Sequence, residues 1–161
     1  MKAPKEISVE KMEMLMPLIR ESLAAGQSVR FYPRGVSMLP MLRQGVDSVL
    51  LSPITGSLRK YDLPLYRRDD GKYVLHRIVG AGSVYTCMGD NQFRPETGLR
   101  QDQMIGVVTA FYRGERMISV TALPYGLYCR FWHITRPLRS FLHRAMGWLR
   151  RHIPGRMRKR G

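Results

Sequence analysis

Between residues 28 and 122 the chain consists of short apolar runs separated by glycine-containing turns, and this restricts it to a fold of short strands. The clearest run is 72–79, which follows the turn Asp69-Asp70-Gly71. Residues 83–88 are expected to pair with it across Gly80-Ala81-Gly82. Further strands are expected at 28–32, 48–51, 63–66, 104–112 and 117–123, the last two joined by Arg113-Gly114-Glu115. This spacing predicts a mainly β fold, an antiparallel barrel or sandwich.

Both ends of the chain are expected to be helical. In residues 1–27, apolar side chains recur every three or four residues, Gly26 is a plausible stop, and Pro17 should kink or divide the helix. In residues 125–161, a helix is expected over 125–153, bent at Pro137, with 154–161 disordered. Its apolar stripe consists of Leu127, Phe131, Ile134, Leu138, Phe141, Ala145 and Trp148. The segment 28–124 would then be the β domain.

The net charge of +15 lies mostly in the C-terminal segment. From Arg130 to Gly161 there are ten Lys or Arg and no Asp or Glu, which leaves the preceding residues at a net +5. An arginine-rich amphipathic helix with Trp132 and Trp148 predicts peripheral binding to an anionic membrane surface through 125–153. The alternative is that the apolar stripe packs on the β domain and the arginines are solvated. Nucleic acid is a weaker expectation because no base-reading module accompanies the basic residues.

Targeting and metal-binding patterns are not found. The N-terminal residues contain no apolar run of signal-peptide type, and no 18 consecutive apolar residues occur. The two cysteines, Cys87 and Cys129, do not form a disulfide framework, and the histidines and cysteines lack zinc-ligand spacing. We therefore expect a cytoplasmic protein without metal or cofactor. If its C-terminal segment binds a membrane, the protein lies peripherally at the inner membrane face.

Two residues could carry hydrolytic chemistry. Ser37 lies in the turn Gly35-Val36-Ser37-Met38-Leu39-Pro40, where Gly35 permits backbone geometry that exposes a hydroxyl and an amide. His76 lies in the best-predicted strand, on the same face as Val74 and Ile78. Burial among apolar neighbours lowers the pKa of a histidine and favours the neutral ring that a general base needs. If the fold brings Ser37 and His76 together, the chain is a hydrolase; taken separately, each residue is more often structural.

Three short motifs together resemble the signal peptidase I and LexA-type serine peptidases of the S24/S26 superfamily. Residues 35–40 resemble its nucleophile box, Leu75-His76-Arg77-Ile78-Val79 its general-base box, and Met88-Gly89-Asp90-Asn91 its Gly-Asp-Asn box. Residues 105–108 resemble the strand that follows. With histidine in the base position, the chain is most similar to the Ser-His signal peptidases. The resemblance covers roughly residues 30–112 and implies a LexA/signal-peptidase-like β fold.

The resemblance implies a serine endopeptidase with Ser37 as nucleophile and His76 as general base. Three residues are candidates for the acid that orients His76. Asp90 is narrowly favoured, Glu96 stands where histidine-type members carry this acid, and Asp102 is a further candidate. Lys72, four residues before His76, is a lower-ranked base.

The chain departs from the signal peptidase pattern in two ways. Those enzymes carry a serine two residues before the nucleophile, where this chain has Gly35, and they carry a membrane-spanning anchor. With Gly35, Val36 and Met38 around Ser37, the Ser37 amide is expected to bear more of the oxyanion stabilisation. The partner would be a peptide or protein substrate bound in extended form. The alternative function is a catalytically inactive, peptide-binding module docked to a membrane or partner through its basic tail.

Overall fold

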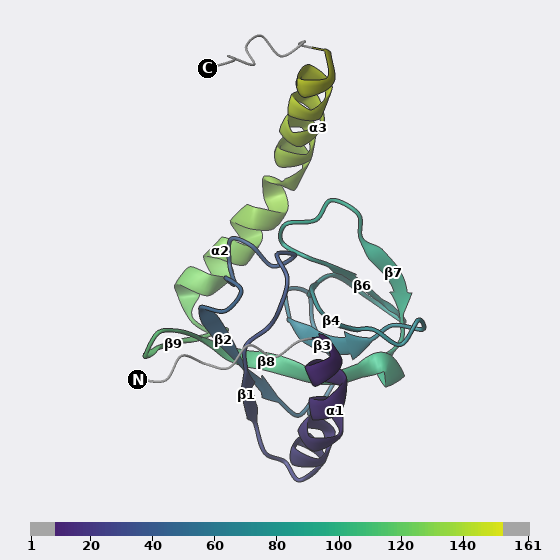
Figure 1. Cartoon of the computed structure of the whole chain (residues 1–161), viewed down its shortest axis with the longest axis vertical. Helices are drawn as coiled ribbons and strands as arrows, with labels where there is room; N and C mark the ends of the chain where they lie inside the picture. Colours follow the sequence, from purple (N-terminus) through teal and green to yellow (C-terminus); the bar gives the residue numbers. More distant parts are fainter. Residues whose placement is uncertain (1–8, 153–161) are drawn as a thin grey trace, which may run out of the picture.

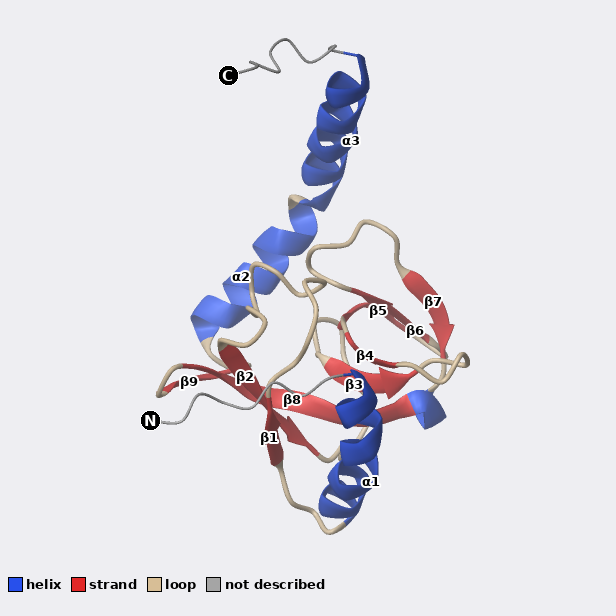
Figure 2. Ribbon diagram, in the orientation of Figure 1, coloured by secondary structure: helices blue, strands red, loops and turns tan. Residues whose placement is uncertain are grey.

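The computed structural model describes residues 9–152, with side-chain surroundings for 13–148 (Figures 1 and 2). The elements are the helices α1 (Val9–Ala24), α2 (Leu123–Ile134) and α3 (Arg136–His152), the short 3₁₀ helix η1 (Gln101–Gln103), and the strands β1 (Val29–Phe31), β2 (Asp47–Ser52), β3 (Pro64–Arg67), β4 (Tyr73–Leu75), β5 (Arg77–Ala81), β6 (Tyr85–Met88), β7 (Glu96–Leu99), β8 (Met104–Arg113) and β9 (Arg116–Ser119). The expected disorder of 154–161 lies outside the described residues.

All strand pairs are antiparallel and form two sheets. The larger has six strands in the order β1-β2-β8-β3-β4, with β9 pairing β8, and the smaller has the order β5-β6-β7. The predicted hairpins β5–β6 and β8–β9 are both present. The prediction of a mainly β, antiparallel fold is therefore confirmed, although the strands of the described part do not close into a barrel.

The predicted strand 72–79 is divided at His76. Its first half, β4, pairs with β3 in the larger sheet, and its second half, β5, pairs with β6 in the smaller. The expected alternation of faces nevertheless holds, because Val74 and Ile78 pack in one core cluster and Leu75 in the other. His76 therefore occupies the point where the chain passes from one sheet to the next.

Two apolar clusters hold these layers together. One joins α1 and α2 to the larger sheet, with Met16 and Ile19 from α1 and Cys129 from α2 beside Val49 and Val108. The other lies between the sheets and contains the buried residues Leu58, Tyr66, Ile78, Tyr85, Cys87, Leu99 and Met104. The first cluster explains why α1 is a single helix although Pro17 lies inside it, since burial of its apolar face offsets the hydrogen bond that proline removes.

The C-terminal helices α2 and α3 begin at the β domain and extend away from it (Figure 1). They meet at Thr135, close to the predicted bend; Pro137 is the second residue of α3, where its missing N–H has no helical partner in any case. The Thr135 N–H donates to the Phe131 carbonyl (2.9 Å), and the Arg139 N–H donates to the Thr135 carbonyl (3.1 Å). The first of these bonds closes α2 and the second opens α3, so one helix ends and the next begins at Thr135. Among the described residues no helix has the length and apolar character needed to cross a bilayer.

Candidate active site

The loop that carries Ser37 joins β1 to β2 and is fixed by the turn that follows β6. The Asn91 N–H donates to the Ser37 carbonyl (2.8 Å), and the Asn91 side-chain amide donates to the Val36 carbonyl (3.2 Å). On the other side, the Gly35 N–H donates to Gln44 Oε1 (2.9 Å) with Gly35 at φ +87°, a conformation that favours glycine. Two of the recognised motifs are therefore in direct contact.

Gly89 brings Ser37 and His76 to the same place. A Cβ added at Gly89 would lie 3.1 Å from the Ser37 Cβ, 3.1 Å from His76 Nε2 and 2.6 Å from the Ser37 carbonyl oxygen. Only a glycine fits between these groups, because real Cβ atoms essentially never approach other atoms so closely. Ser37 and His76 also line one cavity of about 240 Å³. Within residues 9–152, Ser37 Oγ makes no hydrogen bond to protein, so the serine and histidine are neighbours without being bonded.

His76 is 2 % exposed, and its Nδ1 atom is held by two groups. Glu96 Oε1 lies 3.1 Å from Nδ1, and the Tyr66 hydroxyl lies 3.2 Å from it. Glu96 reaches this position because it begins β7 and pairs in register with Cys87 of β6. A carboxylate beside Nδ1 favours the tautomer with hydrogen on Nδ1, which leaves Nε2 with a lone pair that can accept a proton.

Burial and neighbouring charges have opposite effects on the pKa values of His76 and Glu96. Burial is the largest influence on the His76 ring and lowers its pKa from the ordinary value, although the charge of Glu96 partly opposes this shift. Burial alone would raise the pKa of Glu96, but hydrogen bonds from Arg68 and Tyr66, with the charge of Arg68, lower it. Arg68 reaches both carboxylate oxygens. At neutral pH the site therefore holds a neutral imidazole against an ionised carboxylate, the protonation states that a Ser-His-acid triad needs.

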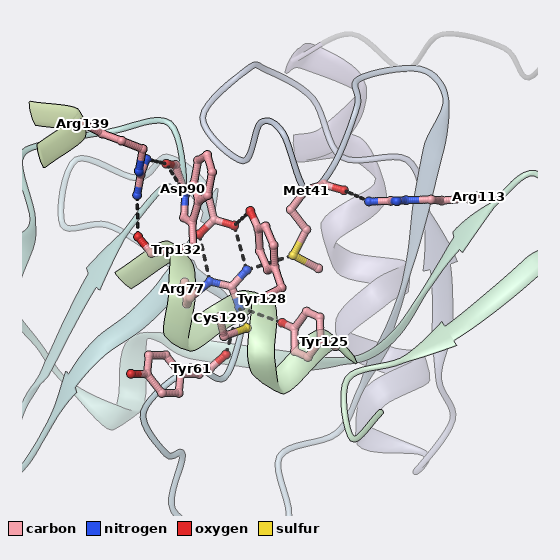
Figure 3. A network of polar contacts seen from close by, with 10 residues as sticks. All are labelled: Met41, Tyr61, Arg77, Asp90, Arg113, Tyr125, Tyr128, Cys129, Trp132 and Arg139. Carbon is pink, nitrogen blue, oxygen red and sulfur yellow. Dashed lines mark hydrogen bonds and ion pairs between the residues drawn. The ribbon is translucent and has the colours of Figure 1, made fainter. Parts of the chain in front are cut away.

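The narrow preference for Asp90 as the acid that orients His76 does not agree with the geometry. Arg77 donates to both oxygens of the buried Asp90 carboxylate (Nε to Oδ1 and Nη2 to Oδ2, each 2.8 Å), and the Tyr128 hydroxyl donates to Oδ2 (3.1 Å) (Figure 3). The Asp90 carbonyl accepts the Trp132 indole N–H (2.8 Å). Asp90 therefore fixes α2 against the Gly89–Asn91 turn, and no bond among the described residues joins it to His76.

The other two candidates from the sequence are elsewhere. Asp102 lies exposed in η1 and pairs with Arg100 (3.1 Å). Lys72 is exposed, and its ammonium pairs with Asp70 (3.3 Å). Neither lines the cavity that contains Ser37 and His76.

Sequence reasoning missed Tyr66 and Arg68, which complete the surroundings of His76 and Glu96. Tyr66 lies in β3 and Arg68 directly follows it, in an ordinary apolar and basic run, and no local signal distinguishes them. Their role depends on β3 pairing with β4, which places Tyr66 opposite Val74.

Other chemistries find less support at this site. Burial, with the charge of Glu96, raises the pKa of the Cys87 thiol to about 12, which makes it a poor nucleophile. The described residues contain no group of three or more His, Cys, Asp or Glu that could hold a metal ion. Comparisons with protein-family models, with curated proteins and with solved structures gave no match.

Proposed function

We propose that the chain is a serine endopeptidase of the S24/S26 type with a LexA/signal-peptidase-like fold. The observation that carries the proposal is that the Ser37 side chain and His76 Nε2 both lie next to Gly89, with Glu96 on the opposite nitrogen of the imidazole. Serine becomes nucleophilic when a neighbouring base accepts its proton, and an acid on the far side of the base fixes its tautomer.

In the proposed reaction, Ser37 Oγ attacks the carbonyl carbon of a peptide bond while His76 Nε2 takes the hydroxyl proton. The tetrahedral intermediate collapses with cleavage of the C–N bond, and the imidazolium gives its proton to the leaving amine. Water, activated in the same way, then hydrolyses the acyl-serine. Within the described part of the chain the backbone N–H groups of Ser37 and Met38 have no protein acceptor, so both are free to stabilise the oxyanion.

The proposed substrate is an extended peptide segment added to the free edge of β4. This strand ends the larger sheet and has β3 as its one sheet neighbour in the described structure. Its residues Tyr73, Val74 and Leu75 line the Ser37 cavity and also an adjoining cavity of about 350 Å³ that is lined in part by Phe31 and Leu65. Strand addition supplies main-chain hydrogen bonds, and the adjoining apolar cavity supplies a side-chain pocket.

The test is incubation of the full chain with a peptide library of defined sequences, with cleavage products identified by mass spectrometry. Shared cleavage positions that are lost in Ser37→Ala support the proposal. The alternative, a non-enzymatic peptide-binding module, accords with the unbonded Ser37 hydroxyl. It predicts peptides that bind along the β4 edge and are not cut by the native chain.

Glu96→Gln is expected to lower the turnover of a cleaved peptide by about 10⁴-fold, the effect of neutralising the acid in other triads. It should also move the acid limb of the pH–rate profile to lower pH. Native activity rises with pH as His76 loses its proton, and the Glu96 charge raises that pKa. Removing the charge therefore lowers the pH at which the base becomes neutral.

The matched control is Asp102→Asn, which removes an exposed carboxylate that does not line the site. It should leave the rate and the profile unchanged. A Glu96→Gln variant with native turnover and an unshifted acid limb would show that Glu96 does not orient His76.

A further inference from the structure

The C-terminal helices have two different faces, and the face turned away from the protein is apolar. On the inner face of α2, Tyr125 and Cys129 are buried, while Tyr128 and Trp132 bind Asp90. Trp132, expected to lie at a membrane surface, is half-buried and donates its indole N–H to the Asp90 carbonyl, so it is not part of the outer face. Leu123, Leu127, Phe131 and Ile134 occupy the opposite face, and Phe131 and Ile134 are 63 % and 73 % exposed.

The apolar face continues onto α3. Beyond Thr135, α3 adds the exposed apolar residues Leu138, Phe141, Leu142 and Met146 to those of α2. The opposite side of α3 is polar: Arg136 donates to the Phe93 carbonyl (3.3 Å), and the His143 ring packs on Phe93 (5.1 Å between centroids). The alternative that this stripe packs on the β domain is thus contradicted by its exposure.

The positive charge of the C-terminal segment indicates which kind of partner binds the exposed apolar face of α2 and α3. Residues 123–148 contain four arginines and no acidic residue, and the sequence from Arg130 onward carries ten basic residues. A second copy of the chain would bring its own charge of +15, so self-association through this face is opposed by repulsion. A nucleic acid would neutralise the arginines but leave the apolar stripe in water. An anionic bilayer satisfies both, since lipid acyl chains accept the apolar side chains and headgroups accept the exposed Arg130 and Arg144.

We propose that the outer face of α2 and α3, formed by Leu123, Leu127, Phe131, Ile134, Leu138, Phe141, Leu142 and Met146, binds the surface of an anionic lipid bilayer. The helices lie in the interface plane and do not cross it. Through Tyr128 and Trp132 this surface is connected directly to Asp90 in the turn that holds Ser37, so bilayer binding fixes the proposed active site close to the membrane. The bilayer-binding proposal does not depend on peptidase activity.

The experiment is flotation of the full chain with vesicles of neutral phosphatidylcholine alone or with about 30 % anionic phosphatidylglycerol. We expect binding to the anionic vesicles at low ionic strength and a decrease of about tenfold or more when salt is raised to roughly 0.5 M. The variant Ile134→Ser/Phe141→Ser should reduce the partition coefficient by about tenfold or more, because it removes two apolar side chains that the bilayer would bury. Met117→Ser, which alters an equally exposed residue on β9, should bind as the native chain does.

Three results would overturn the proposal: no flotation with anionic vesicles, equal flotation of the Ile134→Ser/Phe141→Ser variant, or concentration-dependent oligomers in place of vesicle binding. Both substitutions are at exposed positions, so folding should be retained, and circular dichroism provides the check. Because flotation needs no turnover, a failed peptidase test and a failed membrane test give separate outcomes.

Discussion

Replacing His76 by glutamine is expected to reduce peptide hydrolysis by about 10⁴- to 10⁶-fold, the range found when the base of a serine triad is removed. The reason is geometric: His76 Nε2 is the basic atom that shares the space around Gly89 with Ser37. Without it the serine hydroxyl keeps its proton, and the leaving amine receives none. The measurement is turnover of a library-derived peptide, together with its pH profile between about pH 5 and 8.

The variant should also lose the rise in activity that accompanies deprotonation of His76. Burial lowers the pKa of His76 from its ordinary value in the native chain, so native activity should already be near its plateau at neutral pH. His143→Gln is the matched control, because His143 is exposed on α3 outside the Ser37 cavity, and it should retain native turnover. A folded His76→Gln protein within tenfold of native turnover would contradict the assigned role.

Asp90→Ala is expected to lower the free energy of unfolding by about 3–5 kcal/mol. The substitution leaves the Arg77 guanidinium, 3 % exposed, without the carboxylate that binds it through two hydrogen bonds. It also removes the acceptor for the Tyr128 hydroxyl and so loosens α2. An uncompensated buried charge is among the most destabilising defects in a protein interior. Chemical denaturation followed by circular dichroism measures the effect.

Two further variants show whether the loss of stability in Asp90→Ala comes from the broken ion pair. The double variant Arg77→Met/Asp90→Leu removes both charges and should be more stable than Asp90→Ala, because no buried charge is left unpaired. Asp102→Ala removes an exposed carboxylate and should change stability by less than about 0.5 kcal/mol. If Asp90→Ala costs under 1 kcal/mol, the Arg77–Asp90 pair does not hold α2 to the Ser37 turn.

The sequence was sufficient to predict the parts of the site that depend on local pattern. The motifs around Ser37, His76 and Gly89 identified three segments that the fold does bring into contact, and the hairpin β5–β6 followed from its glycine turn. The apolar stripe from Leu127 to Phe141 was predicted from helical periodicity. Periodicity could not reveal that this stripe faces away from the protein, because exposed and buried helix faces have the same spacing.

The parts that were missed depend on pairing between distant strands. β7 was not predicted because Glu96-Thr97-Gly98-Leu99 is short, contains glycine and lacks alternation. Its register against β6 brings Glu96 to His76. Two carboxylates near one motif are equivalent in sequence. In the fold, Arg77 holds Asp90 away from His76, whereas Glu96 lies 3.1 Å from His76 Nδ1. The break in strand 72–79 likewise reflects a change of sheet partner at His76.

The peptidase proposal and the membrane-binding proposal depend on different residues. Glu96 and Tyr66 contact His76 and Arg68 binds Glu96, whereas Asp90 connects the Ser37 turn to α2. The residues around His76 are thus separate from those that attach the C-terminal helices. Substitutions on the outer face of α2 and α3 should therefore alter membrane binding while leaving hydrolysis of a soluble peptide unchanged.

The most direct test of the central claim is the covalent intermediate itself. The full chain is treated with an activated peptidyl ester, and the product is analysed by intact mass and by fragmentation to locate the acyl group. We predict one acyl group on Ser37, none in Ser37→Ala, and much slower acylation in His76→Gln. Ser37→Ala should fold as the native chain does, because the Ser37 hydroxyl has no protein partner among the described residues. A folded native chain that remains unmodified, or an acyl group that persists in Ser37→Ala, would contradict the assignment of Ser37 as the nucleophile.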